Sequence, residues 1–156
     1  MNNSSIARLL EDLKNPDEMV RQEATAELWR LWFHQKGVLG FELLQRSQTM
    51  LQAGAITDAE TVLNQLIADM PDFAEAWNRR AVLYYVLKQY KRAIADCQMA
   101  IQINPVHFGA LHGLGLCYVA LGEYREAIRA FRKALEVQPY AVENQRWLLE
   151  CTAKLS

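Results

Sequence analysis

The sequence has no long hydrophobic run, no closely spaced cysteine pair and no strong excess of one charge. No apolar stretch approaches the roughly 20 residues of a membrane-spanning helix, and MNNSSIARLLEDL at the start lacks the basic and apolar regions of a secretion signal. Cys97, Cys117 and Cys151 form neither an even set nor a CxxC pair, which favours buried thiols in a reducing compartment. We therefore expect a soluble, intracellular protein in the cytoplasm or, in a plant, in the plastid stroma, with no direct membrane insertion.

Signatures of catalysis and of metal binding are also missing. Gly113-Leu114-Gly115 looks like the start of a dinucleotide-binding fingerprint, but no strand pattern precedes it and Tyr118 replaces the third glycine. His107 and His112 are five residues apart, so on a helix they point about 140° apart and do not converge on one metal ion. We therefore predict that the protein is not an enzyme and has no cofactor, metal site or catalytic residue.

The charge balance gives little reason to expect a nucleic-acid partner. The net charge is −1, but residues 1–73 carry 6 basic and 11 acidic side chains, whereas residues 74–156 carry 11 and 7. This difference could orient a partner or favour head-to-tail contact between copies, although differing solvated helix faces are the simpler interpretation. The length of 156 residues and the 51% hydrophobic content fit one soluble domain with a core.

A 34-residue spacing runs through the chain, because Pro71, Pro105 and Pro139 follow one another at that interval. Aligned on these prolines, residues 74–105 and 108–139 match at small and aromatic positions. The matching pairs are Trp77 with Leu111, Ala81 with Gly115, Tyr84 with Tyr118, Tyr90 with Tyr124, Ala93 with Ala127, Cys97 with Phe131, and Ala100 with Ala134. A more divergent copy covers residues 40–71. The chain is therefore expected to be a repeat structure.

The pattern of Trp, Leu-Gly, Tyr, Ala, Phe, Ala and Pro resembles the tetratricopeptide repeat. The resemblance implies an all-α, right-handed superhelix of about nine helices, with repeats at residues 40–71, 74–105 and 108–139 inside a region spanning 38–140. Residues 1–37 would form an N-terminal helix pair and residues 141–156 a capping helix. The stretches ELWRLW, PDFAEAWNRRA and HFGALHGLG also resemble a mostly uncharacterised group of bacterial and plastid tetratricopeptide proteins.

Three glycines in HFGALHGLG are costly in a helix, at roughly 1 kcal/mol each relative to alanine. Gly115 falls on the side where the neighbouring helix approaches, whereas Gly109 and Gly113 fall on the opposite face, toward the concave groove of a tetratricopeptide stack. Two groove glycines would let another polypeptide lie close to the helix. A bound segment of another protein, or this chain's own N-terminal or terminal helix, would fill that space.

Shifting by 34 residues extends the predicted groove to the other repeats. The candidate protein-binding residues are Gln45, Gln48, Gln52, Asn78, Arg79, Val82, Gly109, His112, Gly113 and Leu116. Amide side chains suit an extended peptide backbone, and the bare apolar patch suits an apolar anchor or a packed helix.

The resemblance also implies which peptide the groove does not suit. The two-carboxylate clamp of tetratricopeptide domains that hold acidic chaperone tails uses lysine, asparagine and arginine. This chain instead has Leu44, Gln48, Arg79, Gly109 and Gly113 at those places. Arg79 could grip one carboxylate, but an ordinary hydrogen bond or salt bridge between repeats is the simpler interpretation.

Trp29, Trp32 and Phe33 make the end of the N-terminal helix pair apolar nearly all round. Such a helix is generally buried, so we expect it to cap the first repeat. The alternative is an exposed aromatic contact for a partner or for a second copy.

These features together predict a non-catalytic protein-interaction module, an adaptor, assembly factor or co-chaperone-like protein that holds a peptide or helix of another protein in the groove. The alternative is a self-associating module that forms a homodimer through the aromatic helix or through ends of opposite charge. RNA binding is disfavoured by both the repeat period and the groove charge.

Overall fold

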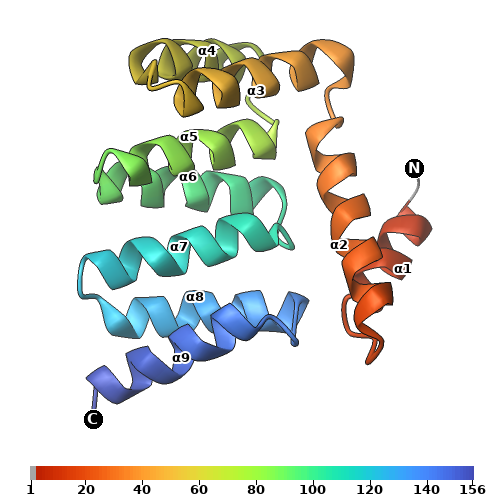
Figure 1. The fold of residues 1–156 in the computed structure, drawn as a ribbon, viewed down its shortest axis with the longest axis vertical. Helices are drawn as coiled ribbons and strands as arrows, with labels where there is room; N and C mark the ends of the chain where they lie inside the picture. The colour runs from red at the N-terminus through yellow and green to blue at the C-terminus, as the bar shows by residue number, and fades with distance from the viewer. Residues whose placement is uncertain (1–2) are drawn as a thin grey trace.

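A computed structural model describes residues 3–156, and within that range the chain forms nine α-helices. They are α1 (Asn3–Asp12), α2 (Glu18–Phe33), α3 (Gly37–Gln52), α4 (Ile56–Asp69), α5 (Ala74–Val86), α6 (Tyr90–Ile103), α7 (Phe108–Ala120), α8 (Tyr124–Val137) and α9 (Val142–Lys154). Helices α3 to α9 form a stack, and α2 runs across the ends of the stacked helices with α1 outside it (Figure 1). None of the described helices is long and apolar enough to cross a membrane.

The stack consists of antiparallel helix pairs whose ends the prolines define. Helices α4, α6 and α8 end at Asp69, Ile103 and Val137, two residues before Pro71, Pro105 and Pro139. Proline has no backbone N–H and disfavours a helical residue before it, so each helix stops there. Neighbouring helices in the series α3 to α9 pack on one another, which makes the stack continuous.

Small residues let the helices of a pair approach closely. An added Cβ at Gly115 of α7 would lie 2.5 Å from the Phe131 ring of α8, so only glycine fits there. On the second helices, Ala93, Ala100, Ala127 and Ala134 are all fully buried. Gly115 therefore has the structural role that its place in the repeat predicts.

Helix α2 is held differently from the others. Asp17 caps its start by accepting a hydrogen bond from the backbone N–H of Met19 at 2.9 Å. The helix then passes the ends where α5 and α7 begin, and its lower half lies near the α8–α9 loop (Figure 1). The sequence predicts that it caps the first repeat. Phe33 does pack beside that repeat's core, but the aromatic residues of α2 pack mainly on residues of α5, of α7 and of the turn before α7.

Candidate functional site

An apolar cavity of about 210 Å³ opens between α5, α6 and α7. It is lined by Asn78, Ala81, Val82, Tyr85, Cys97, Gly109, His112, Gly113, Leu116 and Cys117. Most of these residues come from α5 and α7, the first helices of their pairs. We call this space the inner cavity.

The two groove glycines have different surroundings. An added Cβ at Gly113 would meet only the Cys97 sulfur, at an ordinary contact distance of 3.5 Å. At Gly109 the added Cβ would lie 2.5 Å from the Trp29 ring. The chain's own α2 therefore fills the space beside Gly109, and the open strip is limited to Gly113 and its neighbours.

The aromatic end of α2 is used inside the molecule. The Trp29 ring packs edge-on against Phe108, with centroids 5.2 Å apart, and the Trp32 ring stacks on His107 at 4.6 Å. Phe33 lies under the Arg79 guanidinium, 4.7 Å from its ring centroid to the guanidinium carbon. Trp29, Trp32 and Phe33 are thus not an exposed contact surface for a partner, because these rings already pack against α5, α7 and the turn before α7. The homodimer expected through this helix stays a prediction.

A buried polar pair anchors the surface on which α2 packs. The side chains of Glu75 and His107 are both fully buried, and His107 Nε2 lies 2.6 Å from Glu75 Oε2. His107 Nδ1 accepts the backbone N–H of Ala110 at 3.0 Å, so the ring proton is on Nε2 and is donated to the carboxylate. The pair therefore fixes the start of α7 against α5.

Arg79 completes this arrangement and is not free in the groove. Its Nε donates to Glu75 Oε1 at 2.9 Å, and the Asn78 amide nitrogen donates to the same oxygen at 3.2 Å. The Glu75 carboxylate thus receives three donors, as a buried charge requires. The residue that looked most suited to binding a carboxylate is thus paired within its own helix, and not between repeats as expected.

The predicted groove residues therefore separate into groups. Six of the ten line the inner cavity: Asn78, Val82, Gly109, His112, Gly113 and Leu116. Gln45, Gln48 and Gln52 are exposed on α3 and are not among the residues that line it, and neither is Arg79. His112 is also tied to the last helix, because its Nδ1 lies 2.5 Å from Asn144 Oδ1.

Sequence reasoning missed Ala81, Tyr85, Cys97 and Cys117 as lining residues. Tyr85 lies three residues after Val82, a spacing that puts it on the same helix face and could have identified it. The two cysteines belong to the core pattern and gave no such signal. A hydrogen bond to the Cys117 sulfur, together with burial, raises the pKa of the Cys97 thiol, so at neutral pH it is a protonated, weakly polar group in the cavity wall.

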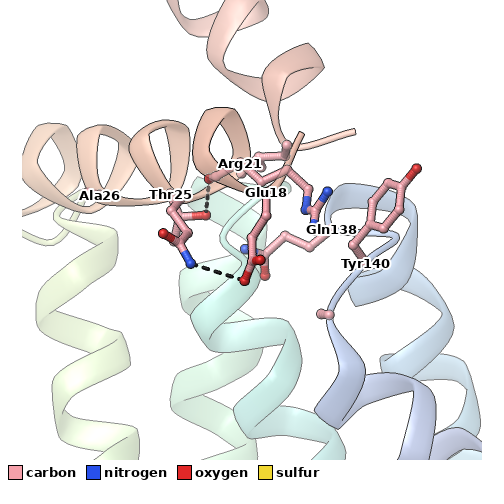
Figure 2. Close-up of a pocket in the computed structure, with 9 residues that line it drawn as sticks. Glu18, Arg21, Thr25, Ala26, Gln138 and Tyr140 are labelled. Carbon is pink, nitrogen blue, oxygen red and sulfur yellow. Dashed lines mark hydrogen bonds between the residues drawn. The ribbon is translucent and has the colours of Figure 1, made fainter. Parts of the chain in front are cut away.

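A second cleft, of about 360 Å³, lies where α2 meets the α8–α9 loop. Figure 2 shows Glu18, Arg21 and Thr25 of α2 on one side and Gln138 and Tyr140 on the other. Arg21 donates to the backbone oxygens of Asn15 and Pro16 and lies over the Tyr140 ring at 4.1 Å. Arg21 thus contacts both the loop before α2 and the Tyr140 ring at the end of the stack.

Among the described residues, no group of three or more His, Cys, Asp or Glu side chains is placed to hold a metal ion. The stacked antiparallel pairs define the chain as an α-solenoid, a class whose repeats bury a continuous core by stacking. Residues 74–107 and 109–140 match the family model of the tetratricopeptide repeat. The chain therefore carries two tetratricopeptide repeats that this model matches, in helix pairs α5–α6 and α7–α8.

Similar proteins agree with this assignment. A TPR repeat-containing protein of Rhizobium etli is 29% identical over 133 residues, which are 85% of this chain and 65% of that protein. The small glutamine-rich tetratricopeptide repeat-containing protein 2 of Saccharomyces cerevisiae is 32% identical over 90 residues, 56% of this chain and 26% of that protein. The chain thus spans less than two thirds of the length of either relative.

Solved structures show the same fold. The first TPR domain of Spaghetti (RPAP3), bound to the HSP90 peptide SRMEEVD, has a TM-score of 0.70 at 23% identity, covering 72% of this chain and 90% of that one. The TPR2B domain of yeast Sti1, in complex with pHsp70, has a TM-score of 0.67 at 21% identity, covering 72% and 95%. Repeat domains of this family are in general non-catalytic protein-interaction modules, and no catalytic family is indicated.

Proposed function

We propose that the chain is a non-catalytic adaptor that binds an uncharged segment of another protein on the face where the inner cavity opens. One large apolar side chain of the bound segment would occupy the cavity. The observation that carries the proposal is the open apolar space beside Gly113, which no side chain of the described residues fills. A cavity of roughly 150 Å³ can take up benzene, so about 210 Å³ has room for a leucine or phenylalanine side chain. The complexes of similarly folded domains with an HSP90 peptide and with pHsp70 support a protein-binding role for the chain.

The polar groups around the cavity suit a peptide backbone and not a charged tail. The Asn78 amide nitrogen is engaged with Glu75, while its oxygen accepts no hydrogen bond from residues 3–156, so we expect it to accept an N–H of the bound segment. Gln45, Gln48 and Gln52 continue the amide character along α3. Because Leu44 is buried, Arg79 is paired and Trp29 covers Gly109, the positions of a two-carboxylate clamp offer no free cation.

Selection from a random-peptide display library, followed by fluorescence-anisotropy titration of the selected peptides, tests the proposal. We expect sequences with a Leu, Phe or Met anchor and no acidic C-terminus. Gly113→Phe fills the cavity and Val82→Glu charges its rim, so each should weaken binding at least about tenfold. The peptide SRMEEVD should show no saturable binding below about 1 mM.

Met19→Glu is the matched control, because Met19 is an exposed apolar residue of α2 outside the cavity. Circular dichroism and thermal unfolding establish that all variants fold equally. Selection of acidic tails, or full retention of affinity in both cavity variants, would show that the inner cavity is not the binding site.

A further inference from the structure

The last helix of the stack carries an unpaired apolar face. Counting by 34, Leu149 of α9 stands where Ala81 and Gly115 stand in the repeats, the position against which a second helix packs. Helix α9 packs on α8 through its other side, where Asn144 and Cys151 are buried. Leu149 and Val142 are each 72% exposed, and they lie seven residues apart, nearly in line along the helix.

The charges beside this apolar line have a symmetrical order. Glu143, Arg146, Glu150 and Lys154 follow one flank of α9 at spacings of three and four residues. Within residues 3–156, Arg146, Glu150 and Lys154 form no ion pair, and Glu143 has only a 3.6 Å approach to His112. From Glu143 to Lys154 the signs run minus, plus, minus, plus, and in the opposite direction along the helix they run plus, minus, plus, minus.

This order is complementary to itself in one orientation only. When two copies of α9 lie antiparallel, Glu143 faces Lys154 of the second copy and Arg146 faces Glu150 of the second copy, on both sides of the two-fold axis. Leu149 then lies beside its own counterpart near the two-fold axis, and Val142 extends the apolar line toward either end of the contact. In a parallel two-fold pairing the charged flanks of the two helices would lie on opposite sides of the contact, so these four charge pairs would not form.

We propose that the exposed face of α9 binds the same face of a second copy, antiparallel, so that each α9 covers the apolar line of the other. The contact is isologous, so it closes at a dimer and does not extend into a fibre. One helix pair buries little surface compared with specific interfaces of about 1,600 Å², so the dimer is weak and forms only at high concentration. The inner cavity is not involved, and the proposal is independent of the peptide-binding function.

Sedimentation velocity from about 1 µM to 1 mM chain measures the dimer. We expect a concentration-dependent dimer in the wild type and a dissociation constant raised at least about tenfold by Leu149→Glu. Arg146→Glu alone or Glu150→Arg alone places like charges opposite each other and should weaken the dimer. The double variant Arg146→Glu/Glu150→Arg restores opposite charges across the axis and should restore dimerisation.

Val82→Glu serves as the control variant, since it changes an exposed apolar residue of the inner cavity and should leave the dimer unchanged. Leu149→Glu should in turn leave peptide binding unchanged, so failure of one proposal is distinguishable from failure of the other. A wild type that stays monomeric throughout would overturn the proposal. So would single charge variants that dimerise as well as the wild type, or a double variant that fails to recover.

Discussion

At the scale of single residues, three glycines of one helix have three different reasons to be glycine. Gly115 admits the Phe131 ring, Gly109 admits the Trp29 ring, and Gly113 borders the open cavity. Their shared residue type therefore conceals a core contact, an attachment point for α2 and a candidate binding surface.

This difference gives a direct prediction for alanine substitutions. Gly113→Ala should leave stability unchanged or raise it by up to about 1 kcal/mol, because alanine is the better helix former and its Cβ fits. Gly109→Ala and Gly115→Ala should each lower the free energy of unfolding by about 1–3 kcal/mol, because the added Cβ overlaps a ring. Urea unfolding of the three variants measures this, and equal effects at all three positions would contradict it.

The sequence allowed a good prediction of these positions but not of their partners. The 34-residue spacing assigned Gly115 to the contact between paired helices, and helical geometry put Gly109 and Gly113 on one face. Which of the two is covered depends on Trp29, 80 residues earlier in the chain. Local patterning carries no information on such a contact, so both the covered and the open alternatives were consistent with the sequence.

At the scale of elements, α2 depends on a few aromatic contacts for its position. Trp29 touches His107, Phe108 and Gly109 at the start of α7, whereas α2 has few close backbone approaches to other parts of the stack. Removing this one side chain should therefore detach α2 while the helix pairs of the stack remain formed.

Trp29→Ala tests this dependence by hydrogen–deuterium exchange. Loss of a large aromatic contact costs about 3–5 kcal/mol, so amide exchange in α2 should accelerate by at least about tenfold. The exchange rates of α6 and α8 should rise much less or stay the same. Leu31→Ala, at a neighbouring half-buried position of α2, is a control for loss of helix-surface contacts in general. If amide exchange in the Trp29→Ala variant accelerates equally in all helices, α2 does not separate from the stack on its own.

The elements themselves were the most predictable part of the structure. The prolines and the small-residue positions indicated the three helix pairs and the last helix, since these signals are local and repeat with the same period. The direction of α2 was not predictable, because a helix with this aromatic pattern can bury its rings equally well against the first repeat or against several repeats.

At the scale of the whole molecule, α2 links parts of the stack that would otherwise contact only their neighbours. Repeat proteins commonly unfold in a nearest-neighbour manner, with ends that open first. Here Phe33 lies beside Arg79 of α5, Trp32 beside His107 before α7, and Arg21 beside Tyr140 before α9. These contacts should raise the cooperativity of the stack.

We therefore expect one unfolding transition in urea. Far-ultraviolet circular dichroism, which follows all helices, and tryptophan fluorescence, which follows Trp29 and Trp32 of α2 as well as Trp77 and Trp147, should give coincident curves. Calorimetric and van't Hoff enthalpies should then agree. Fluorescence that changes at clearly lower urea than the helical signal would show that α2 separates first.

The path of α2 also has a consequence for the nascent chain. Trp32 is synthesised about 75 residues before Phe108, and at roughly 5–20 residues per second this interval lasts roughly 4–15 s. Until α7 has left the ribosome, the aromatic side of α2 has no native surface to pack on. Helix α2 is thus made before the stack on which it packs but reaches its final place after it. During that delay its aromatic side chains are open to capture by a holdase or by a neighbouring polypeptide.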